Sequence, residues 1–204
     1  MKRIATLLAL ASLCTACVGG AFRSDADAPD RYRLAGPAAE PGGVPLPLAV
    51  AVARPRAPSS LDTDRIAVST PGHGFDYLAG ARWADPAPQL LQQLLVGALV
   101  ADARFATVVA APSRVPADLL LDVEIGRFEA VYSTLDAPPT VAVEFGVNLV
   151  DARRGLRMTS FRSAASVTAV RNDRGAVVAA FEQAAGRAVR DAATRIAAAA
   201  AQKP

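Results

Sequence analysis

The chain has 204 residues, of which 52% are hydrophobic and 20% are charged, so it can bury one substantial core and does not have the composition of a disordered chain. Its 22 basic residues exceed its 19 acidic ones, but Lys2 and Arg3 lie in an N-terminal leader, and without them the balance is 20 to 19. The remaining arginines are scattered singly, with no basic stripe among aromatic residues, which argues against a nucleic-acid partner.

Residues 2–17 have the three parts of an export signal. Lys2 and Arg3 give a basic start, an apolar run follows over 4–13, and small residues come after it. The run is shorter than the roughly 20 residues that a membrane-spanning helix needs. We therefore predict that residues 1–16 are a signal peptide and not a membrane anchor.

Both cysteines of the chain lie at the end of this leader, in the stretch Leu13-Cys14-Thr15-Ala16-Cys17, which resembles a bacterial lipobox. In that motif a small residue precedes the cysteine that is lipidated and becomes the new N-terminus. Ala16 therefore favours Cys17 as the lipidated residue, whereas Cys14 follows the bulky Leu13, and two or more acyl chains keep a protein on the membrane. By resemblance to enterobacterial lipoproteins, Val18 after the cysteine implies sorting to the outer membrane, facing the periplasm.

Other interpretations of the two cysteines are a redox or metal-binding C-x-x-C pair, a disulfide, and plain secretion without a lipid. Two cysteines alone cannot complete a tetrahedral zinc site. A redox pair is expected beside a strand and a helix in a folded core and not in an export leader. Lipidation of Cys17 is therefore the favoured prediction.

A segment rich in proline, glycine and alanine comes next. Residues 17–44 are predicted to form the lipidated N-terminus and a flexible linker, with a short extended piece around Tyr32 to Leu34. The folded domain is predicted over 45–201.

The domain is predicted to begin with a buried strand over 46–55 and a second strand over 64–70. A turn over 71–74 follows, with residues 75–80 as a hairpin partner. The single histidine, His73, lies in this turn. Because no second histidine or catalytic motif accompanies it, we interpret it as a loop residue and predict no metal site and no cofactor.

Aromatic residues gather immediately before the first predicted helix, at Phe75, Tyr77 and the only tryptophan, Trp83. Amphipathic aromatic side chains dominate many protein contacts, so Tyr77 and Trp83 are candidate contacts with a partner protein or a lipid. The alternative is that they close the open end of the core beneath the start of the helix.

The predicted helix runs over 85–103, with Asp85 as its N-cap and Pro86 in its first turn. Its apolar face is made by five residues at helical spacing. They are Leu91, Leu94, Leu95, Ala98 and Leu99.

A short strand over 107–110 is followed by two long strands over 117–133 and 140–152. Their alternation predicts a buried face on each strand. The buried residues are Leu121, Val123 and Ile125 on the first, and Val141, Val143, Phe145, Val147 and Leu149 on the second.

Asp122 and Glu124 share the other face of the first long strand, and Glu144 could face them from the next strand, as in a paired-carboxylate catalytic site. The favoured interpretation is that all three lie on the solvated side of a half-covered sheet. We predict no catalytic residue from them.

A strand over 158–170 and a turn over 172–175 lead to a long alanine-rich helix that ends near Ala201. Val178, Phe181, Ala185, Ala188, Ala192 and Ile196 form its apolar stripe. The elements together predict a layered α/β fold, with one mixed β-sheet and flanking helices.

Several of these segments resemble the ABC-type transport auxiliary lipoprotein family, which includes the lipoprotein of the paraquat-inducible system. The matching residues are Arg65 to Val68, Phe75 to Tyr77, Ala81 to Pro86, the leucine-rich helix, and Asp118 to Leu121 with Ile125 and Phe128. The likeness covers about 32–196. Its most specific part runs from Tyr77 through Arg82 and Trp83 to the helix, and these three residues are the candidate partner or lipid contacts.

The resemblance implies an anticodon-binding-domain-like sheet and a role beside an MCE-type lipid transporter. The implied partners are an MCE substrate-binding protein and an ABC permease and ATPase complex, with a homo-oligomer as a further alternative because some members form rings. The family brings no catalytic residues with it, so we expect a non-enzymatic membrane-anchored component. The alternatives are a structural lipoprotein for outer-membrane assembly and a periplasmic hydrolase that uses Asp122, Glu124 or Glu144.

Overall fold

The computed structural model describes residues 28–36, 42–72 and 74–203. Cys17, the predicted signal peptide and His73 lie outside these ranges. The elements follow the chain in the order β1 (Asp30–Tyr32), β2 (Leu46–Val52), β3 (Arg65–Thr70), β4 (Gly74–Trp83), α2 (Ala87–Asp102), β5 (Phe105–Ala110), β6 (Leu119–Val131), β7 (Thr140–Asp151), β8 (Leu156–Thr168) and α3 (Arg174–Ala200).

The sheet is built around β6, which pairs along its whole length with β7 in antiparallel register. β7 pairs with β8 in the same way. The other edge of β6 is divided between two parallel strands, because β2 pairs with its first residues and β3 with its last. β5 extends the sheet beyond β2, while β4 and then β1 extend it beyond β3. The predicted mixed sheet is confirmed.

The chain between β2 and β3 continues beside β6, so the sheet edge is not broken there. The amide of Arg56 donates to the carbonyl of Val123 at 2.9 Å, and the amide of Ile125 donates to the carbonyl of Arg56 at 2.8 Å. A single parallel bridge therefore joins Arg56 to Glu124. This explains why β2 ends before the predicted boundary at 55: the later residues still pair with β6, but without a continuous ladder.

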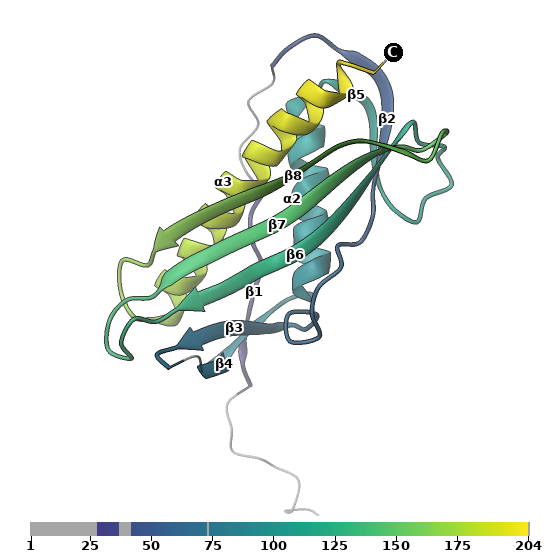
Figure 1. Cartoon of the computed structure of the whole chain (residues 1–204). Helices are drawn as coiled ribbons and strands as arrows, with labels where there is room; N and C mark the ends of the chain where they lie inside the picture. The colour runs from purple at the N-terminus through teal and green to yellow at the C-terminus, as the bar shows by residue number, and fades with distance from the viewer. Residues whose placement is uncertain (1–27, 37–41, 73, 204) are drawn as a thin grey trace, which may run out of the picture.

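The two described helices, α2 and α3, lie on one face of the sheet, as Figure 1 shows. α3 packs on β7 and β8, and α2 packs on α3, β2 and β5. The predicted buried faces of the two long strands are confirmed, since all eight residues are buried. The predicted apolar faces of both helices are buried as well. The layered α/β fold is therefore the one that the sequence predicts.

The start of α2 differs from the prediction. The N-cap position is Pro86, with no capping hydrogen bond from a side chain, and Asp85 instead accepts a hydrogen bond from the side-chain amide of Gln89 at 3.1 Å. The carbonyl of Pro86 accepts from the amides of Gln89 and Leu90. Pro86 thus lies at the boundary itself and not in the first turn, which moves Asp85 one position too far from the helix to cap it.

The predicted linker also contains a strand. β1 pairs in parallel with β4, from Asp30 opposite Ala81 to Tyr32 opposite Trp83. The amide of Ala84 also donates to the carbonyl of Tyr32 at 2.7 Å. The short extended piece predicted around Tyr32 to Leu34 is therefore part of the sheet as Asp30–Tyr32, because pairing with β4, distant in sequence, makes this short segment a strand.

Candidate partner-binding surface

Trp83, one of the three candidate contact residues, lies in the core. Its exposed fraction is 0%, and its ring packs edge-on against Phe181 at 5.0 Å and against Phe128 at 5.9 Å between centroids. These contacts join the last residue of β4 to β6 and α3. The expectation of a partner or lipid contact at Trp83 is therefore corrected, and the alternative interpretation as a core residue holds.

A change of side-chain direction within β4 explains why Tyr77 and Trp83 do not act together. Simple alternation would put both on one face of the strand, since they are six positions apart, which is an even offset. The pairing of β4 with β3 is irregular between Tyr77 and Arg82, and Gly80 in this stretch has a φ of 67°. Glycine adopts this left-handed conformation without a steric penalty. Beyond Gly80, Ala81 and Trp83 consequently point into the core.

Tyr77 remains half-buried on the other face, opposite Ala67 of β3. The guanidinium carbon of Arg65 lies 3.6 Å from the centre of its ring, and its hydroxyl donates to the carbonyl of Ser60 at 3.1 Å. Phe75 packs edge-on against the same ring at 5.4 Å. Tyr77 is held firmly from three sides and still presents part of its ring to solvent, as a contact residue must.

Arg82, the third candidate, is bound to a carboxylate beside Arg65. Its Nη1 atom lies 2.7 Å from Oδ1 of Asp64, and both side chains are partly exposed. The amide of Trp83 donates to the carbonyl of the same Asp64 at 2.7 Å. Arg82, in the same strand as Tyr77, therefore fixes the loop before β3 against the end of β4.

The three carboxylates considered for catalysis are bound to arginines. Arg56 Nη2 lies 3.2 Å from Oδ2 of Asp122 and 3.6 Å from Oε2 of Glu124. Glu144 pairs separately with Arg162 at 3.2 Å. A paired-carboxylate site needs two carboxyl groups aimed at one substrate bond. The arginine pairs instead fit the predicted solvated side of the sheet.

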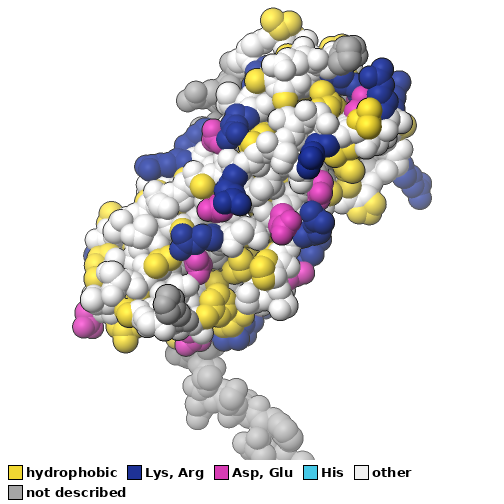
Figure 2. All heavy atoms as spheres, viewed as in Figure 1, with side chains coloured by type: hydrophobic (Ala, Val, Ile, Leu, Met, Phe, Trp, Pro, Cys, Tyr) yellow, Lys and Arg dark blue, Asp and Glu magenta, His cyan; other side chains and the backbone are white. Residues whose placement is uncertain are grey.

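These residues belong to the open face, by which we mean the side of β6, β7 and β8 opposite the helices. Figure 2 shows basic and acidic side chains interspersed over this side, with much small or polar surface between them. The members of its ion pairs are Arg56, Asp122, Glu124, Arg127, Glu129, Glu144 and Arg162. Both signs of charge occur in nearly equal number, so this face has no field of one sign to attract a polyanion.

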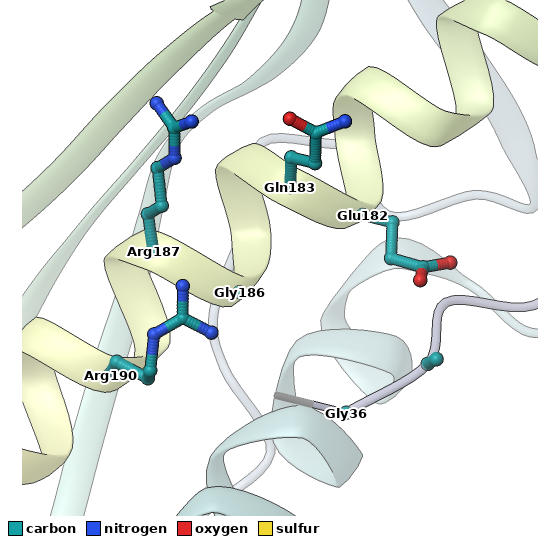
Figure 3. Close-up of a pocket in the computed structure, with 7 residues that line it drawn as sticks. Gly36, Glu182, Gln183, Gly186, Arg187 and Arg190 are labelled. Atoms are coloured by element: carbon teal, nitrogen blue, oxygen red, sulfur yellow. The ribbon is translucent and has the colours of Figure 1, made fainter. Parts of the chain in front are cut away.

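A shallow cavity of about 330 Å³ lies on the outer side of α3 (Figure 3). Ala35 and Gly36 form one wall, and Glu182, Gly186 and Arg190 are among the helix residues of the other. Its charged side chains are exposed, as on any solvated helix face. Among the described residues no group of three or more histidine, cysteine or acidic side chains could hold a metal ion.

A buried polar network that the sequence analysis missed lies at the end of the sheet where β6 begins. Asp151, with an exposed fraction of 5%, accepts hydrogen bonds from the amides of Arg153 and Arg154, both at 3.0 Å, and lies 3.3 Å from Lys203 Nζ. Asp118 accepts from the amide of Ala49 at 3.0 Å. The residues come from distant parts of the chain, so no local pattern could have signalled the network.

The network holds the pKa values of both carboxyl groups below their usual range. For Asp151 the main cause is the hydrogen bond from the amide of Arg154, with Lys203 contributing. For Asp118 the main cause is the amide of Ala49, with Arg153 and Lys203 contributing. Each carboxylate therefore stabilises the fold at pH values above its unfolded pKa of about 3.9, and that stabilisation is lost as the pH falls through the folded pKa.

We expect Asp151→Asn to lower the thermal midpoint at neutral pH, because the amide cannot hold the charge of Lys203 and accepts fewer hydrogen bonds. The variant should also lose less stability than the parent between pH 7 and pH 3. Glu144→Gln is the matched control, since it removes an exposed ion pair that contributes little. Equal pH dependence of the parent and of Asp151→Asn in thermal unfolding would contradict this role.

Neither helix in the described part of the chain is both long and apolar enough to cross a membrane. The described part of the chain is a layered α/β domain with its helices on one face of the sheet, and such a fold does not by itself define a function. The family described as the ABC-type transport auxiliary lipoprotein component matches residues 32–193, most of this length. The chain belongs to this family, which is one of lipoproteins of the cell envelope.

Several solved structures share this fold. Protein XCC0632 from Xanthomonas campestris, a DUF330 protein, is 25% identical, with a TM-score of 0.78 over 85% of this chain and 97% of that one. An uncharacterised protein is 17% identical, with a TM-score of 0.66 over 83% and 99%. Hypothetical protein CT253 from Chlamydia trachomatis shares the fold at 10% identity, with a TM-score of 0.57 over 78% and 100%. No curated protein sequence matches the chain.

Proposed function

We propose that this protein is a non-enzymatic, lipid-anchored auxiliary component of an MCE-type ABC transporter, which moves lipids or hydrophobic solutes across the envelope. The observation that carries the proposal is the family match over residues 32–193. The MCE substrate-binding protein is the partner that reaches this domain. The permease and ATPase complete the machine in the inner membrane.

The proposed anchor is the acylated Cys17, in the outer membrane with the domain in the periplasm. Roughly 13 residue steps separate Cys17 from Asp30, the first residue of β1, and an extended chain of that length spans about 45 Å. As a flexible coil the same segment averages about 20 Å. The domain is therefore held close to the membrane, because β1 shortens the tether.

The proposed contact surface includes Tyr77 and Arg82, which the hairpin of β3 and β4 presents at the side of the sheet. Tyr77 offers a ring that is already fixed by Arg65 and Ser60, so a partner would immobilise few additional bonds on binding. Catalysis is not part of the proposal, and the ion pairs of Asp122, Glu124 and Glu144 support that choice.

A photo-crosslinking residue in place of Tyr77, in the full-length protein in intact cells, tests the proposal. We expect the MCE protein to be captured, and the permease and ATPase to co-purify. The control is the same residue in place of Arg187, on the exposed side of α3, where capture should be much weaker. Capture of outer-membrane assembly proteins alone, at Tyr77, would favour the structural alternative and contradict the transport role.

A further inference from the structure

The tether reaches the domain at a defined end. β1 runs parallel to β4, and its first residue, Asp30, lies opposite Ala81. Arg174, the first residue of α3, binds Oδ2 of Asp30 at 2.9 Å and the carbonyl of Gly80 at 3.1 Å. The chain therefore joins the sheet beside the N-terminus of α3. We call this the anchor end; it includes the turn between β3 and β4, the loop between β6 and β7, and the connection from β8 to α3 (Figure 1).

Large apolar side chains project from the anchor end into solvent. Leu135, in the loop between β6 and β7, has an exposed fraction of 67%, and Val170, between β8 and α3, has one of 80%. Phe75, at the start of β4, has one of 45%. We call these three residues the apolar tip. Phe75 also packs edge-on against Tyr77, but all three side chains leave apolar surface in water, which has a cost and fits a surface that meets an apolar partner.

Hydrogen bonds join the loop between β6 and β7 to the connection between β8 and α3, so this part of the tip is held in a fixed arrangement. The side-chain amide of Asn172 donates to the carbonyl of Leu135 at 2.9 Å, and the hydroxyl of Tyr132 lies 3.1 Å from Oδ1 of Asn172. The charged neighbour Arg171 is neutralised by Asp173 at 2.8 Å. The tip can therefore approach an apolar layer without carrying an unpaired arginine or aspartate from this connection into it.

The length of the tether selects the membrane as the occupant. β6 has 13 residues, and the pairings of β1, β4, β3 and β6 place Asp30 level with about Phe128, so the start of β6 lies about 30 Å from the point where the tether joins the sheet. Turning that opposite end to the membrane would stretch the segment from Cys17 to Asp30 to about 30 Å or more, whereas a flexible coil of this length averages about 20 Å. The anchor end is thus the end that the tether keeps near the lipid.

We propose that the apolar tip rests in the interfacial layer of the phospholipid membrane that holds the anchor, with Leu135 and Val170 inserted and Phe75 at its margin. This rests on the proposed acylation of Cys17. Insertion of two loops beside a covalent tether fixes the orientation of the domain. The opposite end of the sheet, with the network of Asp118 and Asp151, then points away from the lipid.

The test uses full-length acylated protein in vesicles of phosphatidylethanolamine and phosphatidylglycerol. A fluorophore is attached to Leu135→Cys, to Val170→Cys, or to the control Leu156→Cys at the opposite end of the sheet, where the exposed fraction is 63%. Spin-labelled phospholipid should quench the first two at least about threefold more than the third, because interfacial side chains lie within 5–10 Å of the acyl boundary.

Flotation of the vesicles and the mass of the protein are measured on the same samples. Acylated protein that floats but is quenched equally at both ends would overturn the orientation and leave the anchor intact. Protein that is unacylated and does not float would overturn both. The fluorophore at Leu135→Cys could also be protected from a water-soluble quencher and yet not be quenched by the spin-labelled phospholipid. That result would show that a protein covers the tip, and it would also overturn the inference.

Discussion

Trp83→Ala is expected to lower the free energy of unfolding by about 3–5 kcal/mol. The indole is completely buried against Phe128 and Phe181, so its removal leaves a cavity where β4, β6 and α3 meet. Urea unfolding followed by circular dichroism measures the loss. Fluorescence is unsuitable because the chain has only one tryptophan.

Phe75→Ala is the matched control, since it also removes an aromatic ring from β4, but at an exposed position. We expect it to change the free energy of unfolding by less than about 1 kcal/mol. If Trp83→Ala and Phe75→Ala unfolded at the same urea concentration, the assignment of Trp83 to the core would be wrong.

Cys17→Ser is expected to abolish the incorporation of a fatty acid and, with it, the contribution of the protein to envelope function. The sulfur is the proposed attachment point of the lipid, so the serine variant would have no acyl anchor to hold it on the membrane. The thermal midpoint of the domain should not change, because Cys17 lies well before β1, the first strand that the structure describes. Metabolic labelling with a fatty-acid analogue checks the loss of lipid, and thermal unfolding checks that the midpoint is unchanged.

Cys14→Ser is the control, because the lipobox interpretation assigns no lipid to that position. Labelling should persist in this variant. Labelling that disappears in Cys14→Ser and persists in Cys17→Ser would reverse the register of the motif and contradict the proposed cleavage before Cys17.

Much of the fold follows from local periodicity. On β7, five alternate residues from Val141 to Leu149 are all buried, as the pattern predicts. On α3, Phe181 and Ile196 lie on the predicted stripe and are fully buried. These positions succeed because a half-covered sheet and a surface helix impose periods of 2 and 3.6 that the sequence must match.

Two differences from the sequence predictions have a common physical cause, which is pairing between distant segments. β1 is too short to be a strand alone and exists because β4 offers it hydrogen bonds. The irregular pairing at Gly80 separates the directions of Tyr77 and Trp83, which regular alternation would place together. Glycine at position 80 permits this change of side-chain direction, but a glycine in the sequence does not by itself predict one.

Part of the candidate site could be predicted from the sequence, and part only the tertiary structure reveals. The sequence identifies Tyr77 and Arg82 by residue type and by resemblance, and the structure shows that both lie at least partly exposed at the hairpin of β3 and β4. Exposure at Leu135 and Val170 could not be predicted, because apolar residues in loops are often buried by neighbours that only the tertiary structure reveals. The same holds for the pairing of Asp151 with Lys203.

The mass of the N-terminal peptide, in protein taken from the native bacterium, tests the central claim most directly. The account predicts a peptide that begins at Cys17 and carries acyl chains on that residue. A protein that retains residues 1–16, or one that is released into water with an unmodified thiol at Cys17, would contradict the anchored transport component described above.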